Sequence, residues 1–143
     1  MKHNKIFLLL LFFFITFYSF SQSGKIIVKV TDINSSKGKI LLALYNNASS
    51  FPIKSEAYKK GTVRIEHKSA VYTFNNIPEG NYSIAILHDE NDNNKVDKNF
   101  WGIPKERYGF SGIVNSIWST PNFKETSFWV SKNTIKKVTV KLL

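Results

Sequence analysis

Residues 70–88 read AVYTFNNIPEGNYSIAILH, and this stretch decides the fold class. Tyr72 and Phe74 share one side of its first half, and Tyr82 and Ile84 share one side of its second half. Large apolar side chains at every second position indicate a β-strand with one buried face. Both halves are therefore predicted to be strands, and the polar residues between them a turn.

The turn between these two strands has a recognisable sequence. Pro78 fixes one φ angle there, and Gly80 is expected to supply a positive one. The pattern Phe74…Ile77-Pro78-x-Gly80-x-Tyr82 resembles the F-x-x-(I/L)-P-x-G-x-Y corner of transthyretin-like and collagen-adhesin B-type sandwich domains. The resemblance implies an architecture and says nothing about chemistry.

The same alternation recurs along the chain, in Lys25–Thr31, Lys39–Tyr45, Thr62–Lys68, Thr126–Ser131 and Lys137–Leu142. Lys39–Tyr45 is apolar on both faces, as expected of a central strand. With Ala70–Asn75 and Asn81–His88 the chain has seven candidate strands, and it shows no sustained helical period. We therefore predict an all-β protein, an antiparallel β-sandwich of about seven strands with a long ordered loop after the fifth strand.

Composition excludes several classes of protein. The chain has 143 residues, of which 43% are hydrophobic and 21% charged, and no residue is a cysteine. This apolar content is too high for a disordered chain, and without cysteine neither a disulfide scaffold nor a Cys-ligated zinc site can form. The length suits one domain with a core of its own.

The first 21 residues, MKHNKIFLLLLFFFITFYSFS, have the layout of a secretory signal peptide. Two lysines precede the apolar run Ile6–Tyr18, and the small residues Ser19 and Ser21 follow it. The alternative is an uncleaved anchor, but a bilayer span needs about 20 apolar residues. We predict cleavage after residue 21, one β-sandwich domain over residues 22–143, and no stable membrane span afterwards. The product is exported, to the periplasm, the cell surface or the medium.

The mature chain is basic. Of 20 Lys and Arg residues, 18 remain after Lys2 and Lys5 are removed, against 10 Asp and Glu. Nucleic acid is not an expected partner of an exported chain, and the lysines are scattered, with no run longer than two. A solvated, lysine-rich surface is the simplest interpretation.

Residues 88–111, HDENDNNKVDKNFWGIPKERYGFS, are the most informative stretch for function. From Asp89 onward, oxygen-bearing side chains occupy the first, third, fifth and ninth places, as in the opening of an EF-hand calcium loop, whose seventh place contributes a backbone carbonyl. The predicted metal ligands are Asp89, Asn91, Asn93, the carbonyl of Lys95, and Asp97. All are hard oxygen donors on a flexible loop, which favours calcium over zinc or magnesium.

Two departures leave an ion-free alternative open. Asn94 stands where such loops have glycine, although asparagine tolerates a left-handed backbone, and Phe100 replaces the bidentate glutamate. Only two predicted ligands are charged, so a bound calcium would be held weakly. The alternative is an Asx-rich turn whose side chains hydrogen-bond their own backbone.

This stretch closely resembles the signature of a group of secreted bacterial proteins, domain-of-unknown-function family 2141. Its pattern runs roughly H-D-x-N-x-N-x-x-x-D-x-N-x-x-G-x-P-x-E-x-Y-G-F-S. The matching positions are His88, Asp89, Asn91, Asn93, Asp97, Asn99, Gly102, Pro104, Glu106, Tyr108, Gly109, Phe110 and Ser111. The family has no established activity, so the resemblance implies an exported domain and leaves the task open.

The leading functional hypothesis is a non-catalytic module that binds a protein partner or glycan of the cell envelope through residues 88–111. The candidate binding residues are His88, Trp101, Glu106, Tyr108 and Phe110. The aromatic residues of the loop can instead form a satellite core beneath it. The alternative hypothesis is an envelope carbohydrate hydrolase that uses loop carboxylates, among Asp89, Glu90, Asp92, Asp97 and Glu106. No nucleophile or acid–base signature favours an enzyme.

Overall fold

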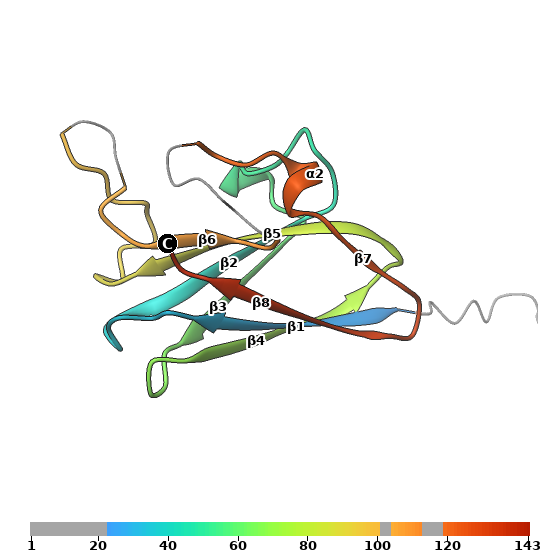
Figure 1. Ribbon diagram of the computed structural model, residues 1–143, viewed down its shortest axis with the longest axis horizontal. Helices are drawn as coiled ribbons and strands as arrows, with labels where there is room; N and C mark the ends of the chain where they lie inside the picture. The colour runs from blue at the N-terminus through green and yellow to red at the C-terminus, as the bar shows by residue number, and fades with distance from the viewer. Residues whose placement is uncertain (1–22, 101–103, 113–118) are drawn as a thin grey trace, which may run out of the picture.

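The computed structural model describes residues 23–100, 104–112 and 119–143, which leaves the predicted signal peptide outside the described part. Eight strands and two short helical turns form there (Figure 1). The strands are β1 (Gly24–Thr31), β2 (Lys39–Tyr45), β3 (Lys59–Arg64), β4 (Ala70–Ile77), β5 (Gly80–Asp89), β6 (Tyr108–Phe110), β7 (Phe128–Val130) and β8 (Ile135–Lys141). The helical turns are η2 (Lys54–Glu56) and α2 (Phe123–Thr126). Within these ranges no helix is long and apolar enough to cross a membrane.

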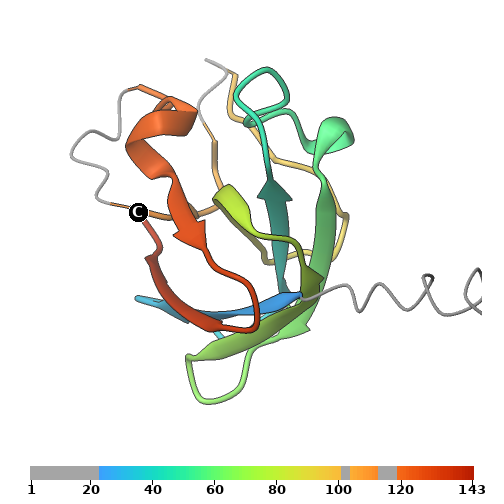
Figure 2. The ribbon, with the colours of Figure 1, turned by 90° about the vertical axis from the view of Figure 1, so that its right-hand side faces the viewer.

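The strands form a β-sandwich-like fold of two sheets. Strands β4, β1 and β8 pair in that order in the smaller sheet. Strands β3, β2, β5 and β6 pair in the larger sheet, to which β7 is added along β5. Figure 2 shows the smaller sheet at the bottom, with the larger sheet and the loops around α2 above it. The predicted all-β class is confirmed.

The core between the sheets follows from the period of two. Ile26, Val28 and Val30 of β1 are fully buried, while Lys25 and Lys29 on the other face of the strand are exposed. These residues share one cluster with Ile40, Leu42 and Leu44 of β2, Ile84 and Ile86 of β5, and Val140 of β8. Burying each such side chain contributes roughly 1.5–3 kcal/mol, so this cluster is the main source of stability.

The structure differs from the sequence prediction in two details of the strands. An eighth strand, β6, forms inside the segment predicted to be a long loop, and it pairs with β5. Strand β8 lies parallel to β1, whereas the other strand pairs of the described chain are antiparallel. A parallel pair needs a long connection, and here most of the chain lies between the two strands.

Two turns are also placed differently. Strand β3 ends at Arg64, and Glu66 and Ser69 exchange two backbone hydrogen bonds of 2.9 Å that close a two-residue turn. His67 lies in this turn with φ +50°, exposed, rather than on a strand. Before β5 the positive φ belongs to Asn76 (+55°), near the end of β4, and the expectation for Gly80 was wrong because Gly80 already lies in the extended strand β5.

Ser111 fastens the segment after β6 to the middle of β5. The Ile84 N–H donates to Ser111 Oγ at 2.8 Å, and the Ser111 N–H donates back to the Ile84 carbonyl at 2.9 Å. The Ser111 hydroxyl in turn donates to the Thr126 carbonyl at 2.7 Å, and Thr126 Oγ1 lies 2.6 Å from Ser83 Oγ. These three side chains are buried, so the network satisfies groups that water cannot reach and holds α2 over the larger sheet.

Candidate functional site

The larger sheet is apolar on its outer face as well as on its core face. Because side chains alternate along a strand, the neighbours of the core residues on β2 and β5 point away from the core. Strand pairing arranges these neighbours in two rows across the sheet. One row is Lys60, Ala43, Ala85 and Phe110, and the next is Thr62, Leu41, Leu87 and Tyr108.

One end of this outer face is covered by aromatic packing. The Phe51 ring contacts the rings of Tyr45, Phe110 and Phe123, with centroids 5.2, 5.8 and 6.1 Å away and edge-on geometry. Phe51 belongs to the loop after β2, and Phe123 belongs to α2. Burial raises the pKa of Tyr45 to about 12.

The other end of the face is covered by the described residues of the segment 89–107, namely 89–100 and 104–107. The turn at the start of this segment is organised by Asp89. The Asp89 side chain is fully buried, and its two carboxylate oxygens accept the backbone N–H groups of Asn93 (3.0 Å) and Asn94 (2.9 Å). The Lys39 ammonium lies 3.6 Å from the same carboxylate. Asn94 has φ +61°, the left-handed conformation predicted for it.

Two further carboxylates close the turn. Asp97 accepts the side-chain amides of Asn91 (2.6 Å) and Asn93 (3.0 Å to each oxygen). The largely buried Glu106 accepts the backbone N–H of Glu90 at 3.2 Å and that of Asp97 at 3.1 Å. Glu106 therefore joins the last residues of the segment, before β6, to the residues that follow β5.

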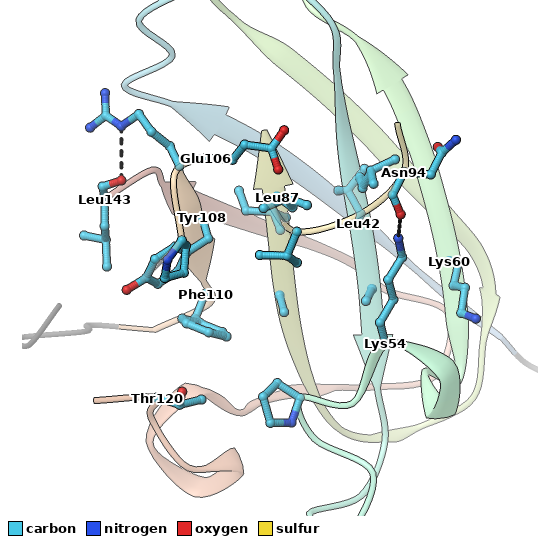
Figure 3. A pocket seen from close by; sticks show the side chains of 18 of the residues that line it. Leu42, Lys54, Lys60, Leu87, Asn94, Glu106, Tyr108, Phe110, Thr120 and Leu143 are labelled. Atoms are coloured by element: carbon cyan, nitrogen blue, oxygen red, sulfur yellow. Dashed lines mark hydrogen bonds between the residues drawn. The ribbon is translucent and has the colours of Figure 1, made fainter. Parts of the chain in front are cut away.

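A pocket of about 1030 Å³ lies between these two covers (Figure 3). Its floor includes Leu41, Ala43, Ala85 and Leu87 from the outer face of the sheet. One wall comes from Asn94, Val96 and Lys98 and from residues 104–106. Pro52 and Lys54 lie opposite, and β6 closes a side with Tyr108 and Phe110. In Figure 3 Lys54 reaches up to donate a hydrogen bond to the Asn94 carbonyl, so the two covers touch at the pocket edge.

The charges around the pocket are mostly positive. Lys54 and Arg107 use their cationic groups to bind backbone carbonyls, Arg107 those of Asp32, Leu142 and Leu143. The ammonium groups of Lys60, Lys98 and Lys105 have neither a hydrogen bond nor an ion pair with any described residue. Glu106 is the one acidic residue that lines the pocket in the described part of the chain.

The structure brings four of the five predicted metal ligands into one hydrogen-bonded turn. Asp89, Asn91, Asn93 and Asp97 contact one another or the intervening backbone, and the Lys95 N–H donates to Asn93 Oδ1 at 2.7 Å. No group of three or more His, Cys, Asp or Glu side chains in the described ranges could hold a metal ion. Calcium also accepts amide and backbone oxygens as ligands, so calcium at this turn stays a prediction.

Four of the five candidate binding residues lie in the described part of the chain, and they divide into two groups. His88 is fully buried on the core side, with Nε2 2.9 Å from the Lys37 carbonyl, so its assignment to a binding surface was wrong. His88 lies two and four positions after Ile86 and Ile84 on the same strand, so its side chain points to the same, core-facing side. Tyr108, Phe110 and Glu106 line the pocket, although the Glu106 carboxylate already serves the loop.

The aromatic residues of the segment do not form one satellite core. Phe110 packs against the cluster of Ala43, Tyr45 and Phe51, as the core alternative predicts. Phe100 is 94% exposed and belongs to no such core. Trp101 lies outside the described residues.

Sequence reasoning missed the pocket floor and its lysines. The floor was signalled by the apolar character of both faces of Lys39–Tyr45, since an outer apolar face has to be covered or used. No local pattern places Lys60 beside Ala43, because that neighbour relation comes from the pairing of β2 with β3.

One protein family matches most of the chain, including both sheets. The model of a family described as "Uncharacterized protein conserved in bacteria (DUF2141)" matches residues 28–138. The chain belongs to the DUF2141 family. The resemblance drawn from residues 88–111 is thereby confirmed, and the match spans all or part of every strand of both sheets. No curated protein and no solved structure matches the chain.

Glu106→Gln should destabilise the segment of residues 89–107. A glutamine presents one acceptor oxygen and one NH₂ group, so either the Glu90 or the Asp97 backbone N–H loses its partner. We expect a loss of about 1–3 kcal/mol in the free energy of unfolding by urea, and faster hydrogen exchange at those two amides. Glu66→Gln, at an exposed turn, is the control and should change neither. Equal stability of the two variants would show that Glu106 does not hold the segment.

Proposed function

We propose that the chain is an exported, non-catalytic binding module that holds an apolar small molecule in the pocket on the outer face of its larger sheet. The observation behind the proposal is a concave site of about 1030 Å³ with an aliphatic floor. Ligand pockets in proteins typically have volumes of ~300–1,000 Å³, mostly apolar linings and a few polar groups. This pocket has that character.

The local structure favours a ligand over a simple gap in packing. The floor lies on β2 and β5, the best-buried strands of the sheet, and its walls are held by the Asp89 and Glu106 hydrogen bonds described above. The hydrogen bonds of Asp89 and Glu106 hold the wall in place, so the apolar side chains of the floor remain uncovered and can contact a ligand.

The alternative, a hydrolase with two loop carboxylates, has less support. Glycoside hydrolysis needs a pair of carboxyl groups that flank the substrate. Asp89, Asp97 and Glu106 each accept N–H groups of their own loop, and of the described pocket residues Glu106 alone has a carboxylate side chain. This arrangement favours a structural role for these groups over a catalytic one.

The pocket also bears on the hypothesis that residues 88–111 bind a protein partner or a glycan. The segment supplies one wall of the pocket through Asn94, Val96 and Pro104, together with Tyr108. The floor, however, presents alanine and leucine side chains rather than an array of hydrogen-bonding groups. An apolar molecule suits this floor better than a sugar does.

Fluorescence of the neutral dye N-phenyl-1-naphthylamine tests the pocket. The dye should brighten on binding, and Leu41→Glu should weaken its affinity by about tenfold or more, since it removes apolar floor and adds a charge. Val71→Glu places the same charge on the exposed side of β4 and is the matched control. Absence of dye binding to the unaltered protein, or equal loss in both variants, would contradict the proposed function.

Export rests on the composition of residues 1–21, a positively charged start followed by an apolar run and small residues. We expect the mature protein from its native host to begin near Gln22. Mass spectrometry of the intact protein checks this, because retention of Met1–Ser21 would identify an uncleaved anchor instead.

A calcium ion at the Asp89–Asp97 turn remains a second proposal. The turn gathers the predicted oxygen donors, and calcium bound to the folded state alone would raise the melting temperature by roughly 5 °C at a concentration tenfold above its Kd. Asp97→Asn should reduce that rise. Asp92→Asn should keep it, because Asp92 pairs with Lys39 at 3.2 Å and is not a predicted ligand. A melting temperature unaffected by several millimolar calcium would leave the ion-free turn.

A further inference from the structure

We propose that the pocket is selective for single-chain amphipathic anions, and that its ligand is a long-chain fatty acid carboxylate. The acyl chain would lie on the aliphatic floor, and the carboxylate would face the lysines at the pocket edge. This inference rests on the proposed function, because it names the chemistry of the molecule that occupies the same pocket.

The shape of the floor comes from the register of the strands. Ala43 of β2 stands opposite Ala85 of β5, so the two smallest apolar side chains of the floor are neighbours. The next pair along, Leu41 opposite Leu87, is larger. Ala43 is 9% exposed and packs in the cluster of Tyr45 and Phe51, but both pairs line the pocket. An alkyl chain in the trough that these two pairs form would make dispersion contacts without any need for hydrogen bonds.

The same register places a cation at one end of the trough. Lys60 stands opposite Ala43 on the side away from Ala85, and Phe110 stands opposite Ala85 on the other side. The row therefore runs from an ammonium group, across two alanines, to an aromatic ring. This order matches a molecule with an anionic head and an apolar body.

Two more cations, Lys98 and Lys105, come from the opposite wall. Neither they nor Lys60 have an ionic or hydrogen-bonding partner among the described side chains and backbone groups. Glu106 supplies the one acidic side chain of the described lining, against five cationic side chains, so the net charge of these side chains is positive. Unpaired charges of one sign at the edge of an apolar site select a ligand of opposite charge.

Competition with the bound dye tests chain length and head group. Octanoate, decanoate and dodecanoate, all below their micelle concentrations, should displace the dye with affinities that rise by about tenfold for each step of two methylenes. Dodecanoate should outcompete both dodecylamine, of opposite charge, and dodecyl maltoside, which is neutral. Maltotriose, which has no alkyl chain, should not displace the dye.

The contribution of the lysines is tested by the triple variant Lys60→Gln, Lys98→Gln and Lys105→Gln. Three partly exposed cations should together contribute about tenfold to the affinity for dodecanoate. The variant should lose that factor, lose the preference for dodecanoate over dodecylamine, and still bind the neutral dye. Lys54 is left unchanged because its ammonium holds the Asn94 carbonyl.

The matched control is the triple variant Lys25→Gln, Lys29→Gln and Lys68→Gln, which lowers the net charge equally at exposed positions outside the pocket lining. It should leave dodecanoate binding unchanged. Equal losses in the two triple variants, or equal displacement by dodecanoate and dodecylamine, would overturn the fatty-acid proposal while dye binding still supports the pocket. Displacement by maltotriose but not by dodecanoate would overturn it in favour of a sugar.

Discussion

Strands β2 and β5 are apolar on both faces, and both faces have to be removed from water. Ile40 and Ile84 face the smaller sheet, which covers them completely. Leu41 and Leu87 face the other way, where the described residues provide two partial covers, one at each end. The pocket is what remains between these covers, so its position follows from the hydrophobicity of two strands rather than from a special functional motif.

Carboxylates determine how one of these covers is built. Asp89 at the end of β5 caps the backbone of the following turn, and Glu106 joins the two ends of the segment. Backbone N–H groups that would otherwise be unpaired near an apolar surface are thereby satisfied. The acidic residues that suggest catalysis in the sequence act in the structure as the frame of a pocket wall, and the neighbouring lysines stay available.

The predictability of each feature from sequence depended on whether its cause is local. The alternation of apolar and polar residues predicts β1, β2 and β5. The spacing of the polar residues predicts that Asp89 and Asp97 belong to one turn, where both accept hydrogen bonds from Asn93. Strand β6 has three residues and is fixed by its contacts with β5, including the Ser111 bond to Ile84, which no local pattern contains. The neighbour of Lys60 likewise depends on strand pairing. The burial of His88 has a local cause, its position two residues after Ile86 on the core face of β5, although a polar side chain is not expected there.

The parallel pair of β1 and β8 has a consequence for the synthesis of the chain. About 100 residues separate the end of β1 from the start of β8, so one edge of β1 stays unpaired for roughly 5–20 s at usual rates of translation. An unpaired strand edge is a template for aggregation. The exposed Lys25 and Lys29 on β1 repel a second copy of the same edge, and so protect the nascent chain until its last strand arrives.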